Sequence, residues 1–80
     1  MDNAPVTIFT TPSCVYCKMA KEFFKKNNVP YQERDVAVDA AAREEMVQKS
    51  GQYGVPVIEV KGKIIIGFDV QHLKEALGIA

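Results

Sequence analysis

The chain has 80 residues, 48% of them hydrophobic and 25% charged, a composition typical of one small globular domain over residues 1–80. Lys and Arg together number 10, as do Asp and Glu, so the formal net charge is zero. This balance argues against nucleic acid or an anionic membrane as a partner, and no apolar run is long enough to span a bilayer.

The amino-terminal segment, residues 1–5, is acidic and polar and lacks the basic and apolar regions of a secretory signal. Because the chain has only two cysteines, Cys14 and Cys17, it is not a domain stapled by disulfides. We therefore expect a monomeric, cytoplasmic protein. In a reducing cytosol, a cysteine pair is more often catalytic or metal-binding than structural.

The first half of the chain predicts a strand, a helix and a second strand. The β-prone residues 6–9 form the first strand, which residues 10–13 interrupt. Apolar residues then recur at spacings of three and four from residue 15 to about residue 27, which predicts a helix. The helical face that these apolar residues mark contains Tyr16, Met19, Ala20, Phe23 and Phe24. The partly alternating residues 31–36 predict the second strand.

The second half begins with a helix and a pair of strands. Asp39 is a suitable N-cap for a helix over residues 40–49. Residues 55–60 and 64–66 predict two strands, joined by a tight turn at Lys61-Gly62-Lys63. The two strands are expected to form an antiparallel hairpin.

A third helix is expected to follow Asp69, which can cap its first turn. Gly51 and Gly78 are placed to end the second and third helices. The residues expected to face inward on the third helix are Val70, Leu73, Ala76 and Leu77. The fold class is therefore α/β, with the order βαβαββα and a right-handed parallel crossover in the first βαβ unit.

The run Cys14-Val15-Tyr16-Cys17 carries the clearest chemical signal. It stands between the first strand and the start of a helix, where the positive end of the helix dipole favours a thiolate. The first thiol, which precedes the helix, is expected to be exposed and can act as a nucleophile. The second lies one turn deeper, is expected to be shielded, and is close enough to form a disulfide with the first. A structural disulfide or half of a zinc site is the competing interpretation. Zinc needs four ligands, and the chain offers one histidine, His72, and no second cysteine pair.

Two further features have both a structural and a functional interpretation. Pro56 removes a hydrogen-bond donor where a strand begins, and the Val55-Pro56 bond is compatible with either a cis or a trans peptide. Gly67 and Asp69 are explained by a turn and a helix cap, although the same helix start could receive a polar ligand. We expect His72 to be a surface or half-buried residue with no catalytic role.

Taken together, residues 14–17, 54–58 and 67–69 resemble the glutaredoxin family, and the resemblance extends over nearly the whole chain. It implies a thioredoxin fold, a three-layer α/β/α arrangement with a four-stranded mixed sheet and three helices. It implies further that Cys14 is the nucleophile and Cys17 the resolving thiol. It also favours a cis peptide at Pro56.

The resemblance implies a groove for glutathione or for an extended substrate strand. The residues that would line it are Tyr16, Gln52, Val55, Pro56, Gly67 and Asp69. Val55 would act through its backbone, as a partner for an added strand. No metal and no bound cofactor are expected, and glutathione would serve as a co-substrate. The expected activity is reduction of disulfide-containing or glutathionylated proteins.

Four positions depart from the usual pattern of that family. Thr11 stands where a Lys is common, Val15 replaces a Pro, Gly54 replaces a Thr, and Ile66 replaces a Gly. Val15 and the Gly67-Phe68 pair are similar to those of the redoxins that serve ribonucleotide reductase and are reduced by a flavoprotein thioredoxin reductase, whereas Tyr16 and Asp69 resemble the glutaredoxin pattern. The electron donor is therefore open between glutathione and that reductase. A dimeric iron–sulfur module and a redox-inert interaction domain are two further functions compatible with the sequence.

Overall fold

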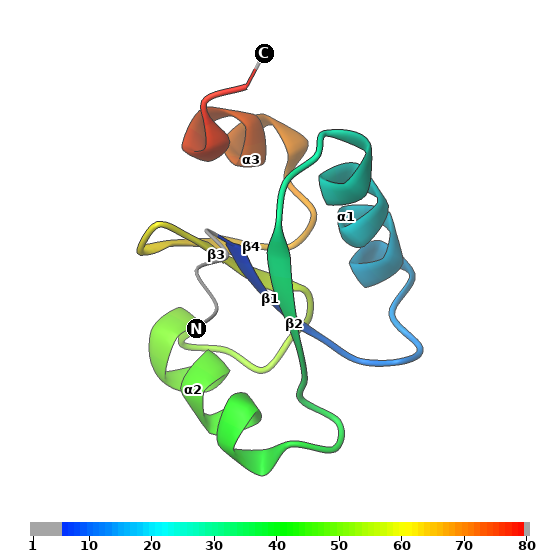
Figure 1. Cartoon of the computed structure of the whole chain (residues 1–80). Coiled ribbons are helices and arrows are strands. Elements are labelled where there is room, and N and C mark those ends of the chain that lie inside the picture. Colours follow the sequence, from blue (N-terminus) through cyan, green and yellow to red (C-terminus); the bar gives the residue numbers. More distant parts are fainter. Residues whose placement is uncertain (1–5, 80) are drawn as a thin grey trace.

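The computed structural model describes residues 6–79, and within them strands and helices follow the expected order βαβαββα (Figure 1). The elements are β1 (Val6–Thr10), α1 (Val15–Lys26), β2 (Tyr31–Asp35), α2 (Ala40–Ser50), β3 (Val57–Val60), β4 (Lys63–Ile66) and α3 (Val70–Leu77). No helix in this part of the chain combines the length and the apolar character needed to cross a membrane.

The strands form one mixed sheet in the order β2-β1-β3-β4. β1 and β2 are parallel, whereas β3 is antiparallel to both β1 and β4. Val57 at the start of β3 lies opposite Phe9 in β1 and Ile66 in β4. The carboxyl ends of β1 and β4 and the amino end of β3 therefore lie at the same end of the sheet, which is where the connecting segments that carry the cysteines and Pro56 begin or end.

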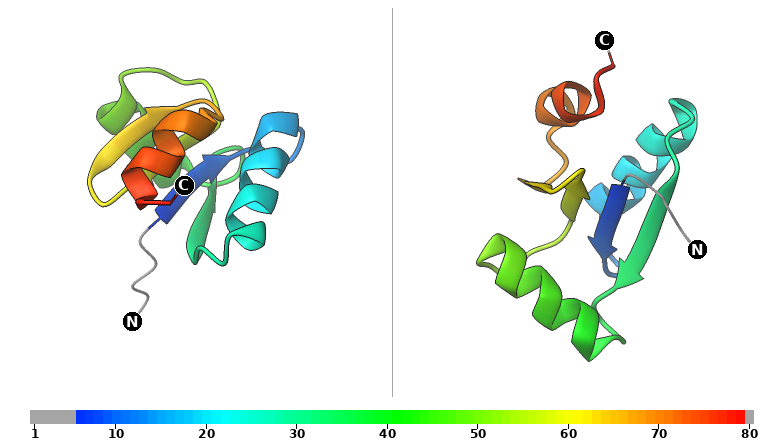
Figure 2. Two further views of the ribbon diagram at one scale, coloured as in Figure 1. Left: turned by 90° about the horizontal axis from the view of Figure 1, so that it is seen from above. Right: turned by 60° about the vertical axis from the view of Figure 1, so that its left-hand side comes forward.

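The helices cover both faces of the sheet, with α2 on the opposite face from α1 and α3 (Figures 1 and 2). Because side chains alternate along a strand, Ile8 faces the layer of α1 and α3, whereas Phe9 faces α2. The core on the α1 and α3 side contains Val6, Ile8, Ala20, Phe24, Ile58, Val60, Ile65 and Leu73. The core on the α2 side contains Phe9, Val36, Ala42, Met46 and Val57.

The buried stripe of α1 contains only part of the apolar face that the sequence marks. Ala20 and Phe24 are fully buried, and the third member of the stripe is Cys17, which was expected to be shielded. Tyr16 is 62% exposed and Met19 is 44% exposed, so these two members of the apolar face lie outside the buried stripe. Positions 17, 20 and 24 form one line along a helix, and residues 16 and 19 lie to one side of it.

The ends of the elements follow local chemistry. Asp39 and Asp69 accept hydrogen bonds from the first turns of α2 and α3, as predicted. Gly51 and Gly78 end these helices in the left-handed conformation, with φ of 76° and 72°. The strand predicted over residues 55–60 begins only at Val57, because a proline cannot donate to the ladder.

Ion pairs connect α2 to the sheet. Arg34 of β2 contacts Glu45, and Lys49 contacts Glu45 at 2.9 Å and Glu59 of β3 at 2.7 Å. The two cations hold the pKa of Glu45 below its usual range. These side chains are partly exposed, so the pairs set the placement of α2 more than they stabilise the domain.

The packing of α1 against β1 yields a stability prediction. Phe24 is fully buried, so Phe24→Ala removes a ring from the core and leaves a cavity. We expect the free energy of unfolding to fall by about 3–5 kcal/mol. Val38 is 82% exposed, and Val38→Ala, the matched control, should change stability by no more than about 0.5 kcal/mol. Equal shifts of the two midpoints in a urea titration would contradict this account of the core.

Candidate active site

Cys14 is the N-cap of α1. Its backbone is extended, with φ −86° and ψ 113°, and its Sγ accepts a hydrogen bond of 3.1 Å from the N–H of Cys17. Its carbonyl accepts from the N–H of Lys18, at 3.3 Å. An N–H of the first helical turn therefore points at the sulfur, and the positive end of α1 stabilises negative charge on it. Both cysteines are free thiols in this structure.

Cys17 lies one turn further along α1 and points into the core. Its side chain is 1% exposed, whereas Cys14 is partly exposed. Burial raises the pKa of Cys17 to about 12, and the hydrogen bond between the two thiols adds to this effect. The nearby charge of Lys21 acts weakly in the opposite direction. At neutral pH the pair therefore consists of an accessible sulfur at the helix start and a buried, protonated one.

A polar cluster of Thr10, Glu33 and Lys21 lies where β1 ends and the loop that carries Cys14 begins. Thr10, at the end of β1, is 1% exposed and donates from Oγ1 to Oε2 of Glu33 at 2.8 Å. The same carboxylate oxygen accepts from Nζ of Lys21 at 2.9 Å. The hydrogen bond raises the pKa of Lys21 and lowers that of Glu33. Glu33 is not among the residues predicted from the sequence, because only the pairing of β1 with β2 places its carboxylate beside Lys21 of α1.

Pro56 precedes β3 at the same end of the sheet. The Val55-Pro56 peptide bond is cis, which settles the question that the residues alone left open. The carbonyl of Pro56 accepts a hydrogen bond of 2.8 Å from the N–H of Gly67. Within residues 6–79, neither the N–H nor the C=O of Val55 makes a hydrogen bond to another backbone group. These two groups are thus available to an extended ligand.

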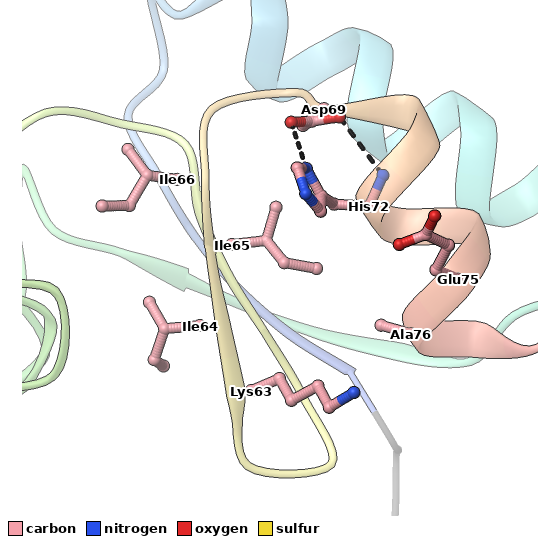
Figure 3. A pocket seen from close by; sticks show the side chains of 8 residues that line it. All are labelled: Lys63, Ile64, Ile65, Ile66, Asp69, His72, Glu75 and Ala76. Carbon is pink, nitrogen blue, oxygen red and sulfur yellow. Dashed lines mark hydrogen bonds and ion pairs between the residues drawn. The ribbon is translucent and has the colours of Figure 1, made fainter.

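Asp69 follows β4 and caps α3. Its Oδ1 accepts from the backbone N–H of His72 at 3.2 Å, and its Oδ2 lies 2.5 Å from Nδ1 of the same residue (Figure 3). This ion pair lowers the pKa of Asp69 and raises the pKa of His72. Gly67, with φ of 83°, provides the turn between the strand and this cap. His72 lies on the surface, in agreement with the expectation.

Asp69 and His72 belong to the wall of a cavity of about 390 Å³ between β4 and α3. Figure 3 shows the side chains that line it: Lys63, Ile64, Ile65, Ile66, Asp69, His72, Glu75 and Ala76. Ile66, which departs from the usual glycine, is 53% exposed at this edge of the sheet. The lining of the cavity therefore combines apolar side chains from β4 and α3 with charged or titratable ones.

The remaining predicted groove residues differ in their availability. Tyr16 is exposed in the first turn of α1, directly after the loop that carries Cys14. The side chain of Gln52 turns back on its own loop, where Nε2 donates to the carbonyl of Gly54 at 3.0 Å. That contact holds one N–H of the amide and leaves Oε1 and the second N–H for a ligand. Val15 is 65% exposed, so both residues between the cysteines present a large hydrophobic side chain to solvent.

Metal ligands do not gather anywhere in residues 6–79, in that no three side chains of His, Cys, Asp or Glu converge. The chemistry available at this site is that of two thiols, a helix start and the polar groups around them.

Comparisons with known proteins agree with this arrangement. The family model described as Glutaredoxin matches residues 6–65. The chain is 45% identical over 72 residues to an uncharacterized glutaredoxin-like 8.6 kDa protein in the rubredoxin operon of Clostridium pasteurianum, covering 90% of this chain and 96% of that protein. It is 37% identical over 75 residues to glutaredoxin 3 of Escherichia coli (strain K12), covering 94% of this chain and 90% of that protein.

The crystal structure of the thioredoxin-like protein BC3987 superposes with a TM-score of 0.84 at 37% identity, covering 89% of this chain and 97% of that chain. This similarity, together with the sheet order, confirms the expected thioredoxin fold.

The different surroundings of the two thiols predict selective alkylation. In the folded protein at neutral pH, iodoacetamide should modify Cys14 and leave Cys17 unmodified, because burial and its high pKa keep Cys17 protonated. Mass spectrometry of tryptic peptides would locate the label. Cys17→Ser should label as the wild type does, and Cys14→Ser should label only after unfolding. Equal labelling of both thiols in the folded wild type would contradict the assigned geometry.

Proposed function

This chain belongs to the glutaredoxin family, and we propose that it reduces disulfides with Cys14 as the nucleophile and Cys17 as the resolving thiol. One observation carries the proposal: Sγ of Cys14 accepts the N–H of Cys17 at the start of α1, while the sulfur of Cys17 is buried beneath it. A target disulfide therefore meets one accessible nucleophile, Cys14, and the sulfur of Cys17 is held within reach for the following step.

In the proposed cycle, the thiolate of Cys14 attacks one sulfur of a target disulfide. A bond forms between Cys14 and that sulfur, and the other target sulfur leaves as a thiolate and takes up a proton. Cys17 then loses its proton and attacks the sulfur of Cys14, which releases the second target sulfur. The target gains two electrons, and the Cys14–Cys17 pair is oxidised to a disulfide.

The surroundings of Cys17 suit this order of events. In the reduced protein its pKa is raised by burial and by its hydrogen bond to Cys14. Once Cys14 is part of a mixed disulfide, it no longer carries the negative charge that disfavours a second thiolate beside it. The pKa of Cys17 is then expected to fall, although the burial that raises it most persists, so the resolving thiol becomes more reactive after the first step.

We propose glutathione as the reductant that restores the pair. Its γ-glutamyl end carries an ammonium and a carboxylate on the same carbon. Asp69 offers a carboxylate to the ammonium, and the start of α3 favours the carboxylate. The free backbone groups of Val55 can pair with the peptide portion. Pro56 and Gly67 border this path, and Tyr16 and Gln52 complete the proposed groove.

A flavoprotein thioredoxin reductase is the second candidate donor. An exposed Ile66 stands where the family commonly has a glycine, and one N–H of the Gln52 amide is engaged within its own loop. Both features weaken the hold on glutathione and leave the dithiol accessible to a protein. The proposed targets are disulfide-containing or glutathionylated proteins, among which ribonucleotide reductase would correspond to this second donor.

A coupled assay with two donors tests the proposal. NADPH oxidation is followed with a disulfide substrate, once with glutathione and glutathione reductase and once with thioredoxin reductase alone. We expect turnover in the glutathione arm, because Asp69 and Val55 provide contacts for that tripeptide. Cys14→Ser is the control and should abolish turnover in both arms. Turnover in the reductase arm alone would replace glutathione by the second donor, and inactivity in both arms would reject the function.

The two thiols should respond differently to substitution. Cys17→Ser should still remove glutathione from a glutathionylated protein. In that reaction glutathione passes to Cys14, and a second glutathione molecule can resolve the disulfide between Cys14 and glutathione. The variant should lose reduction of protein disulfides, which needs the resolving thiol. Rates with both substrates would be compared with the wild type. Equal loss in the two assays would contradict the proposed roles of Cys14 and Cys17.

A further inference from the structure

His72 is held against the carboxylate that the proposed function assigns to glutathione. Asp69 is engaged by this one residue twice, through the backbone N–H at 3.2 Å and through Nδ1 at 2.5 Å (Figure 3). His72 is the only histidine in the sequence, and its side chain is 67% exposed, so its ring can exchange protons with solvent. The pair stands at the start of α3, in the wall of the cavity beside β4.

Few other charges face this ring. Glu75 lies one turn later on α3, and Lys63 lies on β4, across the same cavity. Asp69 and, to a smaller extent, Glu75 raise the pKa of His72, so the imidazolium persists closer to neutral pH than in a free histidine. Asp69 itself, whose pKa is lowered, stays ionised across the range in which His72 titrates.

The protonation state of the ring changes what Asp69 offers to a ligand. A protonated His72 compensates the carboxylate, and an incoming ammonium then meets a pair with no net charge. A neutral ring can still donate from Nδ1 and hold the same geometry, but the negative charge of Asp69 is no longer compensated. An ammonium group is attracted to the carboxylate more strongly in this second state.

We propose that His72 is a positioning residue that weakens the binding of the glutathione ammonium group at Asp69 when its ring is protonated. This inference rests on the proposed function, in which Asp69 receives the γ-glutamyl end. A flavoprotein donor does not use that subsite, so its reaction would not respond to the protonation of His72. The balance between the two donors would then shift towards glutathione as the pH rises through the pKa of His72.

The effect of His72 protonation can be measured through the binding of S-methylglutathione. Because this ligand has no free thiol, titration of a ligand thiol does not contribute to the pH dependence of its Kd. Its Kd would be measured by NMR at about pH 6 and about pH 8, on either side of the usual range of a histidine beside a carboxylate. In the wild type we expect binding to be about two- to fivefold weaker at the lower pH, the size expected for one exposed charge pair. The same ligand should lower the pKa of His72 in the NMR titration of its ring, because the linkage is reciprocal.

Three variants define the source of the effect. His72→Gln keeps a hydrogen-bond donor at the third helical position but cannot titrate, so the pH dependence of Kd should disappear. Glu75→Gln, the matched control, removes a charge from the same cavity wall and should keep the pH dependence. Asp69→Asn should bind weakly at both pH values and return the pKa of His72 towards that of a free histidine.

The outcomes distinguish the inference from the proposed function. If S-methylglutathione binds to the wild type and His72→Gln shows the same pH dependence, the role of His72 is wrong, and the glutathione groove stands. If it binds to neither protein at either pH, the glutathione groove itself is wrong, and the role of His72 falls with it. The inference is supported if the pH dependence of Kd is lost in His72→Gln and kept in Glu75→Gln, and if the ligand lowers the pKa of His72 in the wild type.

Discussion

The packing of α1 against the sheet, which buries Cys17 in line with Ala20 and Phe24, is the constraint on which the dithiol site depends. Cys17 continues the stripe of Ala20 and Phe24 that closes the core on β1. Because this sulfur is fixed in the core, the turn before it is fixed as well, and Cys14 is placed at the helix start with an N–H aimed at its sulfur. Burial thus keeps one thiol protonated while the helix dipole stabilises charge on the other.

The directions of the strands assemble the rest of the site. Since β3 runs antiparallel to β1 and β4, the chain reaches one end of the sheet three times, at the loop before Cys14, at Pro56 and at the turn before Asp69. These segments are far apart in sequence, and no local signal specifies their meeting. Polar groups lie on two sides of this end of the sheet. Glu33 accepts a hydrogen bond from Thr10, just before the loop that carries Cys14, and His72 contacts Asp69.

Features that short-range interactions control could be predicted from the order of residues alone. Two cysteines separated by two residues at a helix start are enough to predict the dithiol and the exposed position of Cys14, because a helical turn spans that spacing. The order of elements followed from periodicity, and Asp69 as a helix cap from the reach of its side chain, three residues along the chain. Each of these predictions rests on contacts within four residues, which the local sequence encodes.

The arrangements between elements depend on the three-dimensional packing. The apolar pattern of α1 includes Tyr16 and Met19, but the rotation of the helix on the sheet leaves both exposed and buries Cys17 with Ala20 and Phe24. Glu33 reaches the active-site loop only because β2 pairs in register with β1. The cis peptide before Pro56 and the pairing of Asp69 with the ring of His72 were likewise open in the sequence. Their outcome depends on packing and side-chain placement in three dimensions, which residue spacing along the chain does not specify.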